Sequence, residues 1–421
     1  MLSRILLLSL ISGVLLEKWM SYIASEINYY GMDPINSEMR WIVGTGAIFL
    51  TIVSTAAIRG KLFWVVFAFW IFFVLPNSLT FMLFDVDPIF LFATTFSALI
   101  VSGALIFAAN NGRAPATTEG RYPVQTRTQN VARIMYFGFA FSLFYFFLIH
   151  RFDINYQAIF LTDIYDWRWE ITGERSGLEN RLFSWATKSF MFSALVLSIT
   201  TKRYIMLGVT TIGALYLFST SGQKSIVFWA VAVGFFVMAA EGNLPILRRK
   251  WSIALIVTAL ASYPPIELGF DNFVVRRMLF LPTYLNEAYL QTFPEPLFLA
   301  HSIFNGVFSF YKFDVAPAYL VGREYWGFYV SLNNGVVSDG YINFGFFGAL
   351  LFPIIALSLC IFVARRLDGA YFVIVIPYVW QFNNSALITT LFGHGFVFLV
   401  FWALANSRLR HQPRGMMTTV N

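Results

Sequence analysis

Charged side chains are scarce in this chain. Asp, Glu, Lys and Arg make up 12% of its 421 residues, whereas a soluble domain usually carries about 25%. Hydrophobic residues account for 58% of the chain and include 48 phenylalanines. The remaining polar groups are too few to cover a water-facing surface, which excludes a soluble domain and indicates an integral membrane protein.

Cysteine is scarcer still, and metal-binding patterns are missing. Cys360 is the only cysteine, so no internal disulfide can form. No group of His, Cys, Asp and Glu has the spacing of a metal site, so the sequence predicts no metal and no cofactor. The net charge of +7 comes without a basic nucleic-acid-binding motif, which argues against nucleic acid as a partner.

The chain does contain a series of apolar segments of the length that a helix needs to cross the hydrocarbon of a bilayer, about 20 residues. They predict an all-α, polytopic protein with about twelve transmembrane helices in a single membrane domain, residues 1–421. The first segment lacks a small-residue cleavage site, which favours an uncleaved helix over a signal peptide. We expect breaks in the third segment at Pro76-Asn77 and in the eleventh near Pro377. The segments centre near residues 13, 49, 70, 98, 142, 191, 212, 232, 259, 355, 375 and 397.

The distribution of Lys and Arg predicts the orientation, because loops on the cytoplasmic side carry an excess of these residues. With both termini inside, the inner segments hold 17 basic residues and only three acidic ones, Glu119, Glu241 and Asp368. We therefore expect a multi-pass protein of the bacterial inner membrane with both termini in the cytoplasm. The inner basic residues are Arg4, Arg59, Lys61, Arg113, Arg121, Arg127, Arg133, Lys202, Arg203, Arg248, Arg249, Lys250, Arg365, Arg366, Arg408, Arg410 and Arg414.

Three segments between the spans are longer than simple connections. Residues 110–133 are rich in Gly, Pro and Thr and predict a flexible cytoplasmic linker. Residues 152–188 and 268–340 predict two long periplasmic loops that are rich in Arg, Tyr and Trp. This composition suggests an anionic, sugar-bearing substrate handled outside the membrane.

Several cations on the outer side are candidate ligands for a pyrophosphate, since the planar guanidinium group binds phosphate oxygens in pairs. A salt-bridged surface helix around Arg168 and the binding of lipid headgroups by Arg276 and Arg277 remain open alternatives. Lys224 could equally extend its charge to the membrane interface. The candidates are Arg168, Arg175, Arg276, Arg277, Lys224 and Arg323.

Three titratable residues of the second outer loop are candidates for the group that takes a proton from a sugar hydroxyl: Asp339, His301 and Glu287. The alternatives are an N-cap role for Asp339, at the start of a span, and a structural role for His301. Aromatic side chains stack on sugar faces or anchor at lipid headgroups. The aromatic candidates for sugar binding are Trp167, Trp169, Tyr289 and Tyr341.

Two short runs, together with about twelve spans and two long Arg-rich outer loops, carry a resemblance to a known family. One run extends from Arg276-Arg277 through Pro282 to Tyr289, and the other is DGYINFGFFG, from Asp339 to Gly348. In these features the chain resembles the Wzy-type polymerases of O-antigen and oligosaccharide repeat units.

The resemblance implies a metal-independent glycosyltransferase with a GT-C-like helical architecture. Its substrates would be glycans linked to undecaprenyl pyrophosphate, which it would join into O-antigen or a related surface polysaccharide at the periplasmic face. It also implies membrane lipids and a chain-length regulator protein as partners. An O-antigen ligase, which transfers the finished glycan to lipid A-core, would share this architecture and donor. A transporter of lipid-linked oligosaccharides or sugars is the alternative of another class, although it would place more charge within the spans.

Overall fold

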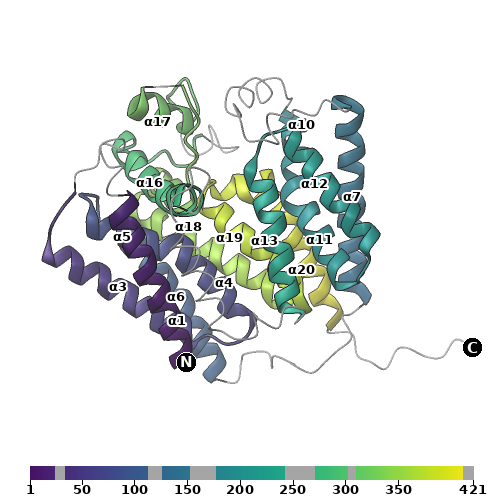
Figure 1. The fold of residues 1–421 in the computed structure, drawn as a ribbon. Helices are drawn as coiled ribbons and strands as arrows, with labels where there is room; N and C mark the ends of the chain where they lie inside the picture. The colour runs from purple at the N-terminus through teal and green to yellow at the C-terminus, as the bar shows by residue number, and fades with distance from the viewer. Residues whose placement is uncertain are drawn as a thin grey trace, which may run out of the picture. The chain divides into compact units, whose positions relative to one another are not determined.

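The computed structural model describes residues 1–23, 34–111, 126–151, 177–241, 271–301, 310–327 and 329–410, and this part of the chain is all-helical (Figure 1). Seven of its helical segments are long and apolar enough to cross a membrane, which makes this a membrane protein. They are Leu2–Ile23, Glu38–Ala57, Lys61–Leu83, Ile89–Asn110, Thr128–His150, Gly177–Thr200 and Val336–Arg366.

These seven helices coincide with predicted spans one to six and ten. Three further predicted spans form shorter apolar helices, Tyr204–Ser219, Lys224–Ala240 and Phe396–Asn406. The eleventh forms a short helical run that ends at Asn383. The ninth, near residue 259, lies outside the described residues.

The chain divides into two compact units, each assembled from separate stretches of sequence. Unit 1 comprises Met1–Thr118, Pro245–Cys360 and Tyr378–Thr390, and the remainder forms unit 2. Because each unit is discontinuous, no single change in composition along the chain marks a boundary between them.

Unit 1 holds the first four long helices and the whole sequence range of the second predicted outer loop. Its described elements are α1 (Leu2–Lys18), η1 (Trp19–Ile23), α3 (Glu38–Ala57), α4 (Lys61–Phe69), η3 (Trp70–Val74), α5 (Leu75–Leu83), α6 (Ile89–Asn110), η5 (Asp271–Phe280), α16 (Leu281–Thr292), α17 (Pro317–Trp326), α18 (Val336–Arg366) as far as Cys360, and the end of α19 (Val375–Asn383).

The break expected at Pro76-Asn77 does not occur, and that prediction is wrong. A π-helical turn, η3, precedes Pro76, and the helix continues through α5 to Leu83. Proline cannot donate a backbone hydrogen bond, and the wider π turn accommodates it without ending the helix. Asn77 Nδ2 donates to Phe73 O at 2.7 Å, so the amide satisfies a backbone carbonyl within this turn.

Helix α16 is part of the packed body of unit 1, although it falls within a predicted loop. Every residue from Pro282 to Tyr289 is buried. Two polar contacts join α16 to α5: the Thr80 and Thr283 hydroxyls lie 3.1 Å apart, and Asn286 Nδ2 donates to Asn77 Oδ1 at 3.5 Å. The second loop therefore inserts a helix against the third span.

Helix α18 contains a kink within the run DGYINFGFFG. Phe344 and Gly345 have non-helical backbone angles, and Gly345 has φ +60° and ψ −148°, a region open essentially to glycine alone. A Cβ atom on Gly340 would overlap the carbonyl oxygen of Gly348. Gly340 and Gly345 thus let the short first part of α18 pack directly against the long second part.

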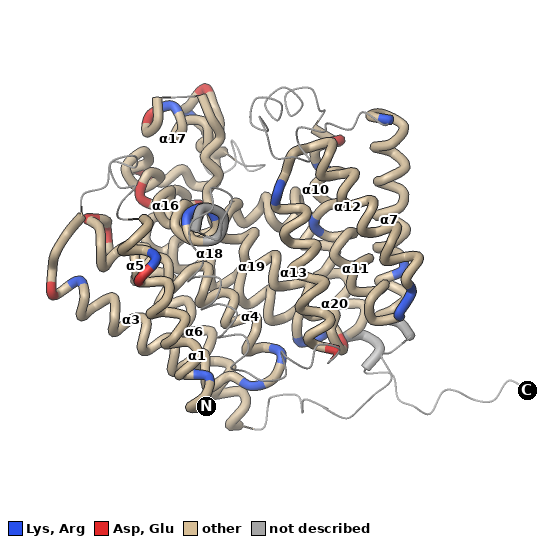
Figure 2. Tube along the Cα trace, in the orientation of Figure 1, with Lys and Arg blue, Asp and Glu red and all other residues tan. Residues whose placement is uncertain are grey.

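Unit 1 separates its charges between two ends. At the basic end, Arg4 donates to the carbonyl oxygens of Ala56 and Ile58, beside Arg59 and Lys61. At the acidic end, Arg40 pairs with Asp85, and Glu287 bonds to Asp87. Along α3, Arg40 and Ala57 are about 26 Å apart, close to the thickness of the hydrocarbon core, about 30 Å. In Figure 2 the helix bodies between these ends are mostly tan, the colour of residues other than Lys, Arg, Asp and Glu.

Unit 2 packs its helices around α11, which contacts α7, α12 and α13. Asn406 ties three segments of this unit together, because its amide donates to Thr128 Oγ1 and to Arg366 O, both at 3.2 Å. The described elements that lie wholly within unit 2 are α7 (Thr126–His150), α10 (Gly177–Trp185), η4 (Ala186–Phe190), α11 (Met191–Thr200), α12 (Tyr204–Ser219), α13 (Lys224–Ala240), η6 (Gly369–Ile374) and α20 (Phe396–Arg410).

Two of the predicted loops overlap described helices of this unit. The linker expected at 110–133 ends earlier, because α7 begins at Thr126. The first outer loop, expected at 152–188, also ends earlier, because residues 177–188 belong to the helical run Gly177–Thr200. In both cases the polar residues at the end of the predicted loop form the first turns of a helix.

Candidate functional site

Three segments of unit 1 meet at Asp339. Its Oδ2 accepts the backbone N–H of Leu387 at 2.9 Å, and its Oδ1 accepts from Asn343 Nδ2 at 3.1 Å. The carboxylate is almost fully buried, with 4% of its side chain exposed. The third segment contributes His301, whose Nε2 lies 3.6 Å from Asp339 Oδ1. We call His301, Asp339 and Asn343 the His-Asp site.

Asp339 is not the N-cap of α18, so the alternative role considered from the sequence is wrong. The helix begins at Val336, and the backbone N–H of Asp339 already donates to Gly335 O within the helix, at 2.9 Å. Its side chain instead bonds to Asn343, one turn further on, and to Leu387, which follows α19. An N-cap side chain would bond to backbone N–H groups of the first turn, and this one does not.

The backbone leading to His301 is fixed on the end of the short first part of α18. The N–H groups of Leu297 and Phe298 donate to the carbonyls of Ile342 and Asn343, at 2.7 and 3.2 Å. The N–H of Leu299 donates to Asn343 Oδ1 at 2.8 Å. The kink at Phe344 and Gly345 leaves these acceptors without helical donors, and the segment before His301 takes them.

The two ring nitrogens of His301 have different surroundings. Nε2 faces Asp339, while Nδ1 is buried and has no hydrogen-bond partner among the described residues. A carboxylate beside Nε2 favours the tautomer that carries its proton there, which leaves a lone pair on Nδ1. A histidine oriented in this way can accept a proton from a hydroxyl, and the carboxylate then stabilises the imidazolium that forms.

Two tyrosines border the His-Asp site. Burial, followed by the negative charge of Asp339, raises the pKa of Tyr289 well above its ordinary value. Burial, with a smaller contribution from Asp314, raises the pKa of Tyr311 to about 12. The ring of Tyr311 lies 6.4 Å from that of His301. Both tyrosines therefore stay neutral near pH 7.

The close approach of these segments requires glycine. A Cβ atom on Gly335, directly before α18, would overlap the carbonyl oxygen of Asn383 at the end of α19. This contact brings the start of α18 and the segment after α19 together, and so places Leu387 N–H on Asp339. The site is thus built by backbone packing as well as by its side chains.

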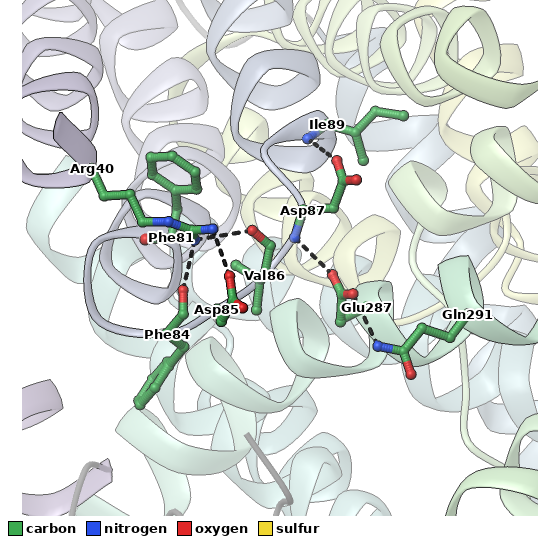
Figure 3. Close-up of polar contacts among 9 residues, drawn as sticks. All are labelled: Arg40, Phe81, Phe84, Asp85, Val86, Asp87, Ile89, Glu287 and Gln291. Carbon is green, nitrogen blue, oxygen red and sulfur yellow. Dashed lines mark hydrogen bonds and ion pairs between the residues drawn. The ribbon is translucent and has the colours of Figure 1, made fainter. Parts of the chain in front are cut away.

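Glu287 occupies a separate position at the acidic end of unit 1 (Figure 3). Its Oε2 accepts from Asp87 N at 3.1 Å and its Oε1 from Gln291 Nε2 at 3.1 Å. Burial raises the pKa of this carboxyl, and the nearby charges of Asp87 and Asp85 raise it further, against the opposing effect of the two hydrogen bonds. Glu287 is therefore a second candidate proton acceptor, fixed by backbone and amide donors.

Arg40 stabilises the loop that presents Asp87 to Glu287. Its guanidinium donates to Phe84 O at 2.8 Å, Val86 O at 3.0 Å and Asp85 Oδ1 at 2.7 Å, as Figure 3 shows. The same group lies over the Phe81 ring, 4.7 Å from its centroid. This arginine satisfies carbonyls of the segment that directly follows α5.

The predicted pyrophosphate ligands that the structure describes belong to several different elements. Arg276 and Arg277 lie in η5, directly before α16, with Arg276 half-buried and Arg277 exposed. Arg323, on α17, pairs with Asp314 at 3.2 Å on the surface. Lys224 is the first residue of α13 in unit 2. Arg168 and Arg175 lie outside the described residues.

The aromatic candidates differ in accessibility. Tyr289 is fully buried, and its hydroxyl donates to Leu332 O at 2.7 Å, so it packs within unit 1. Tyr341 is half-buried, and its ring lies 5.8 Å from that of Phe90. Trp167 and Trp169 lie outside the described residues.

The sequence did not indicate Asn343 or the backbone of Leu387 as parts of the site. Asn343 carries a usable signal, because it lies four residues after Asp339 and so on the same helical face. The N–H of Leu387 has none, since any residue other than proline supplies one. Among the described residues, no group of three or more His, Cys, Asp or Glu is arranged to hold a metal ion.

Comparisons with protein-family models, with curated proteins and with solved structures found no match to this chain.

Proposed function

We propose that this protein is a metal-independent glycosyltransferase with a GT-C-like architecture of about twelve spans that joins lipid-linked oligosaccharide repeat units into a polysaccharide. The observation that carries the proposal is the His-Asp site, a buried carboxylate facing one nitrogen of His301 while the other nitrogen lacks a partner among the described residues. Together with the resemblance to Wzy-type polymerases in the run from Asp339 to Gly348, this arrangement favours proton abstraction from a sugar hydroxyl.

The proposed reaction transfers a glycan from its lipid pyrophosphate to a hydroxyl group. The acceptor hydroxyl gives its proton to His301 Nδ1, and its oxygen attacks C1 of the donor glycan. The bond between C1 and the pyrophosphate oxygen breaks, and undecaprenyl pyrophosphate leaves with the electron pair. Asp339 stabilises the imidazolium. Arg276 and Arg277 stabilise the departing charge, the kind of electrostatic effect that is usually largest in catalysis.

The charge separation in unit 1 supports a periplasmic position for this chemistry. The basic end, with Arg4, Arg59 and Lys61, would face the cytoplasm by the positive-inside tendency. The acidic end, with Glu287 on α16, would then face the periplasm of a bacterial inner membrane. Undecaprenyl-linked oligosaccharide, membrane lipids and a chain-length regulator are the partners of this proposal.

Reconstitution tests the proposal directly. The purified full chain in liposomes, supplied with undecaprenyl-pyrophosphate-linked repeat units, should produce a ladder of glycans that differ by one repeat. His301→Gln should yield no ladder. Transfer of the glycan only when lipid A-core is added would instead indicate a ligase. Movement of the lipid-linked glycan across the bilayer without any new glycosidic bond would indicate a transporter and would exclude the proposal.

A further inference from the structure

Unit 2 contains a second polar cluster, formed by Ser184, Lys188 and His394. The Ser184 hydroxyl lies 2.7 Å and Lys188 Nζ 2.9 Å from the same atom, His394 Nδ1. Ser184 and Lys188 are one helical turn apart, and both side chains reach the segment that precedes α20. Neither Lys188 nor His394 takes part in the proposed transfer reaction.

The backbone is shaped to bring these residues together. Lys188 lies within the π-helical turn η4, and such turns are frequent at functional sites. Trp185 Nε1 donates to Phe392 O at 2.7 Å, and Ser189 Oγ donates to Gly395 O at 2.9 Å. Gly395 has φ +78°, and a Cβ atom there would lie 2.6 Å from Ser189 Oγ. Only glycine permits this approach, which holds His394 against Lys188.

The cluster has more hydrogen-bond donors than acceptors. When Lys188 is protonated, its ammonium group has three N–H donors and no acceptor, so His394 Nδ1 then accepts from Lys188 and carries no proton itself. The Ser184 hydroxyl supplies a fourth donor aimed at the same lone pair. Among the described residues, the structure places no other acceptor on Lys188 Nζ or on Ser184 Oγ. One lone pair cannot satisfy four donors.

The charge of the cluster is also unbalanced. Lys188 lies at the middle of the 24-residue apolar helix Gly177–Thr200 and is half-buried. No carboxylate in the described part of the chain lies within ion-pair distance of it. Ionisable residues within membrane spans are costly, usually paired, and mark binding sites or ion pathways.

We infer that Ser184, Lys188 and His394 form a binding site for a phosphate group. Phosphate supplies both missing elements, negative charge for Lys188 and several strong acceptor oxygens for the surplus donors. The same chemistry occurs in the headgroup of a membrane lipid and in free phosphate. The site is distinct from the residues of the proposed transfer reaction, and its test does not depend on that reaction.

Thermal unfolding of the purified full chain in a neutral maltoside detergent tests the inference. The probes are dioctanoyl phosphatidic acid, inorganic phosphate, and dioctanoylglycerol as the matching lipid without phosphate. Saturating phosphatidic acid should raise Tm by about 4 °C, and dioctanoylglycerol should not. An equal rise with inorganic phosphate would identify a free phosphate as a sufficient ligand, and a rise with phosphatidic acid alone would identify the lipid headgroup.

Variants locate the effect. Lys188→Met should abolish the rise in Tm, whereas Lys202→Met, the same change at an exposed position of unit 2, should retain it. Ser184→Ala, which removes only one donor, should weaken phosphate binding about ten-fold and serves if Lys188→Met fails to fold. The inference is overturned if no phosphate probe raises Tm, or if Lys188→Met or Ser184→Ala responds as fully as the unmodified chain.

Discussion

The imidazole of His301 faces the carboxylate of Asp339, with Nε2 and Oδ1 3.6 Å apart. The two residues belong to separate segments of unit 1. This distance exceeds that of a hydrogen bond but lies within that of an ion pair once the imidazole is protonated. Asp339 is fixed by Leu387 N–H and Asn343. The pair therefore combines an anchored carboxylate with a histidine whose second nitrogen is buried and has no hydrogen-bond partner among the described residues.

Removing the base should abolish activity while leaving the fold intact. His301→Gln should lower the rate of glycan transfer by about 10²- to 10⁴-fold, because the amide cannot accept the proton. The structure places no hydrogen bond on His301 Nδ1 in the described region, so the amount of protein in the membrane should stay near normal. Full polymer length in cells that express this variant would exclude His301 as the base.

Asp339→Asn should affect both activity and stability. An amide has a single acceptor oxygen, so it cannot accept from Leu387 N–H and Asn343 Nδ2 with two separate oxygens, as the carboxylate does. We expect a loss of about 1–3 kcal/mol in the free energy of unfolding in addition to reduced transfer. Thermal unfolding and a transfer assay on the same preparation separate the two effects. An unchanged Tm would contradict the anchoring role.

Gly345→Ala should destabilise the protein by about 1–3 kcal/mol, since its backbone angles are open essentially to glycine alone. The matched control is Gly103→Ala in α6, where a Cβ atom would meet nothing within 4 Å. The control should be neutral or stabilising by up to about 1 kcal/mol, because alanine favours helix over glycine. Equal Tm values for the two variants would show that the kink is not required.

The buried carboxyl of Glu287 should make stability depend on pH. Its pKa is raised in the folded state, chiefly by burial, so folding favours the protonated form. That contribution to stability is fully present below the unfolded pKa, about 4.3, and is lost as the pH rises through the folded pKa. Glu287→Gln should flatten the fall in Tm from mildly acidic pH toward neutrality. An identical pH profile for both proteins would contradict this.

Arg276 and Arg277 should not tolerate lysine if they hold a pyrophosphate. Lysine retains the charge but loses the planar fork that binds two oxygens at once. Arg277→Lys should therefore lower transfer at least ten-fold, measured on lipid-linked repeat units. Arg203→Lys in unit 2, an exposed position between α11 and α12, is the control and should transfer normally. Normal activity of both Arg276→Lys and Arg277→Lys would move the pyrophosphate site elsewhere.

The orientation can be tested with single introduced cysteines, because Cys360, the only native one, is buried. A membrane-impermeant maleimide added to intact spheroplasts should label Asp314→Cys and leave Arg59→Cys unlabelled. Reporter fusions at Arg121 and Asn421 should both indicate the cytoplasm. The opposite labelling pattern would invert the proposed topology and place the His-Asp site on the cytoplasmic side.

The sequence alone determined the class of the protein and the position of most of its helices. Hydrophobicity summed over about 20 residues is a local property, so the seven long helices fall where the apolar segments predict them. The sequence also indicated His301 and Asp339, because both are titratable groups between or beside apolar spans. The sequence did not indicate which residues contact His301 or Asp339, because side chains distant in sequence meet only in the folded protein.

Tertiary structure decided the rest. The π turn before Pro76 keeps a helix intact that local propensity would break. The burial of α16 converts part of a polar loop into packed core, through contacts with α5 that no local pattern encodes. The anchoring of Asp339 depends on a backbone N–H after α19 and on a kink in α18. The convergence of Lys188 and His394 depends on the backbone of Gly395. The last three of these features are long-range contacts, and their free energy exists only once distant segments have been brought together.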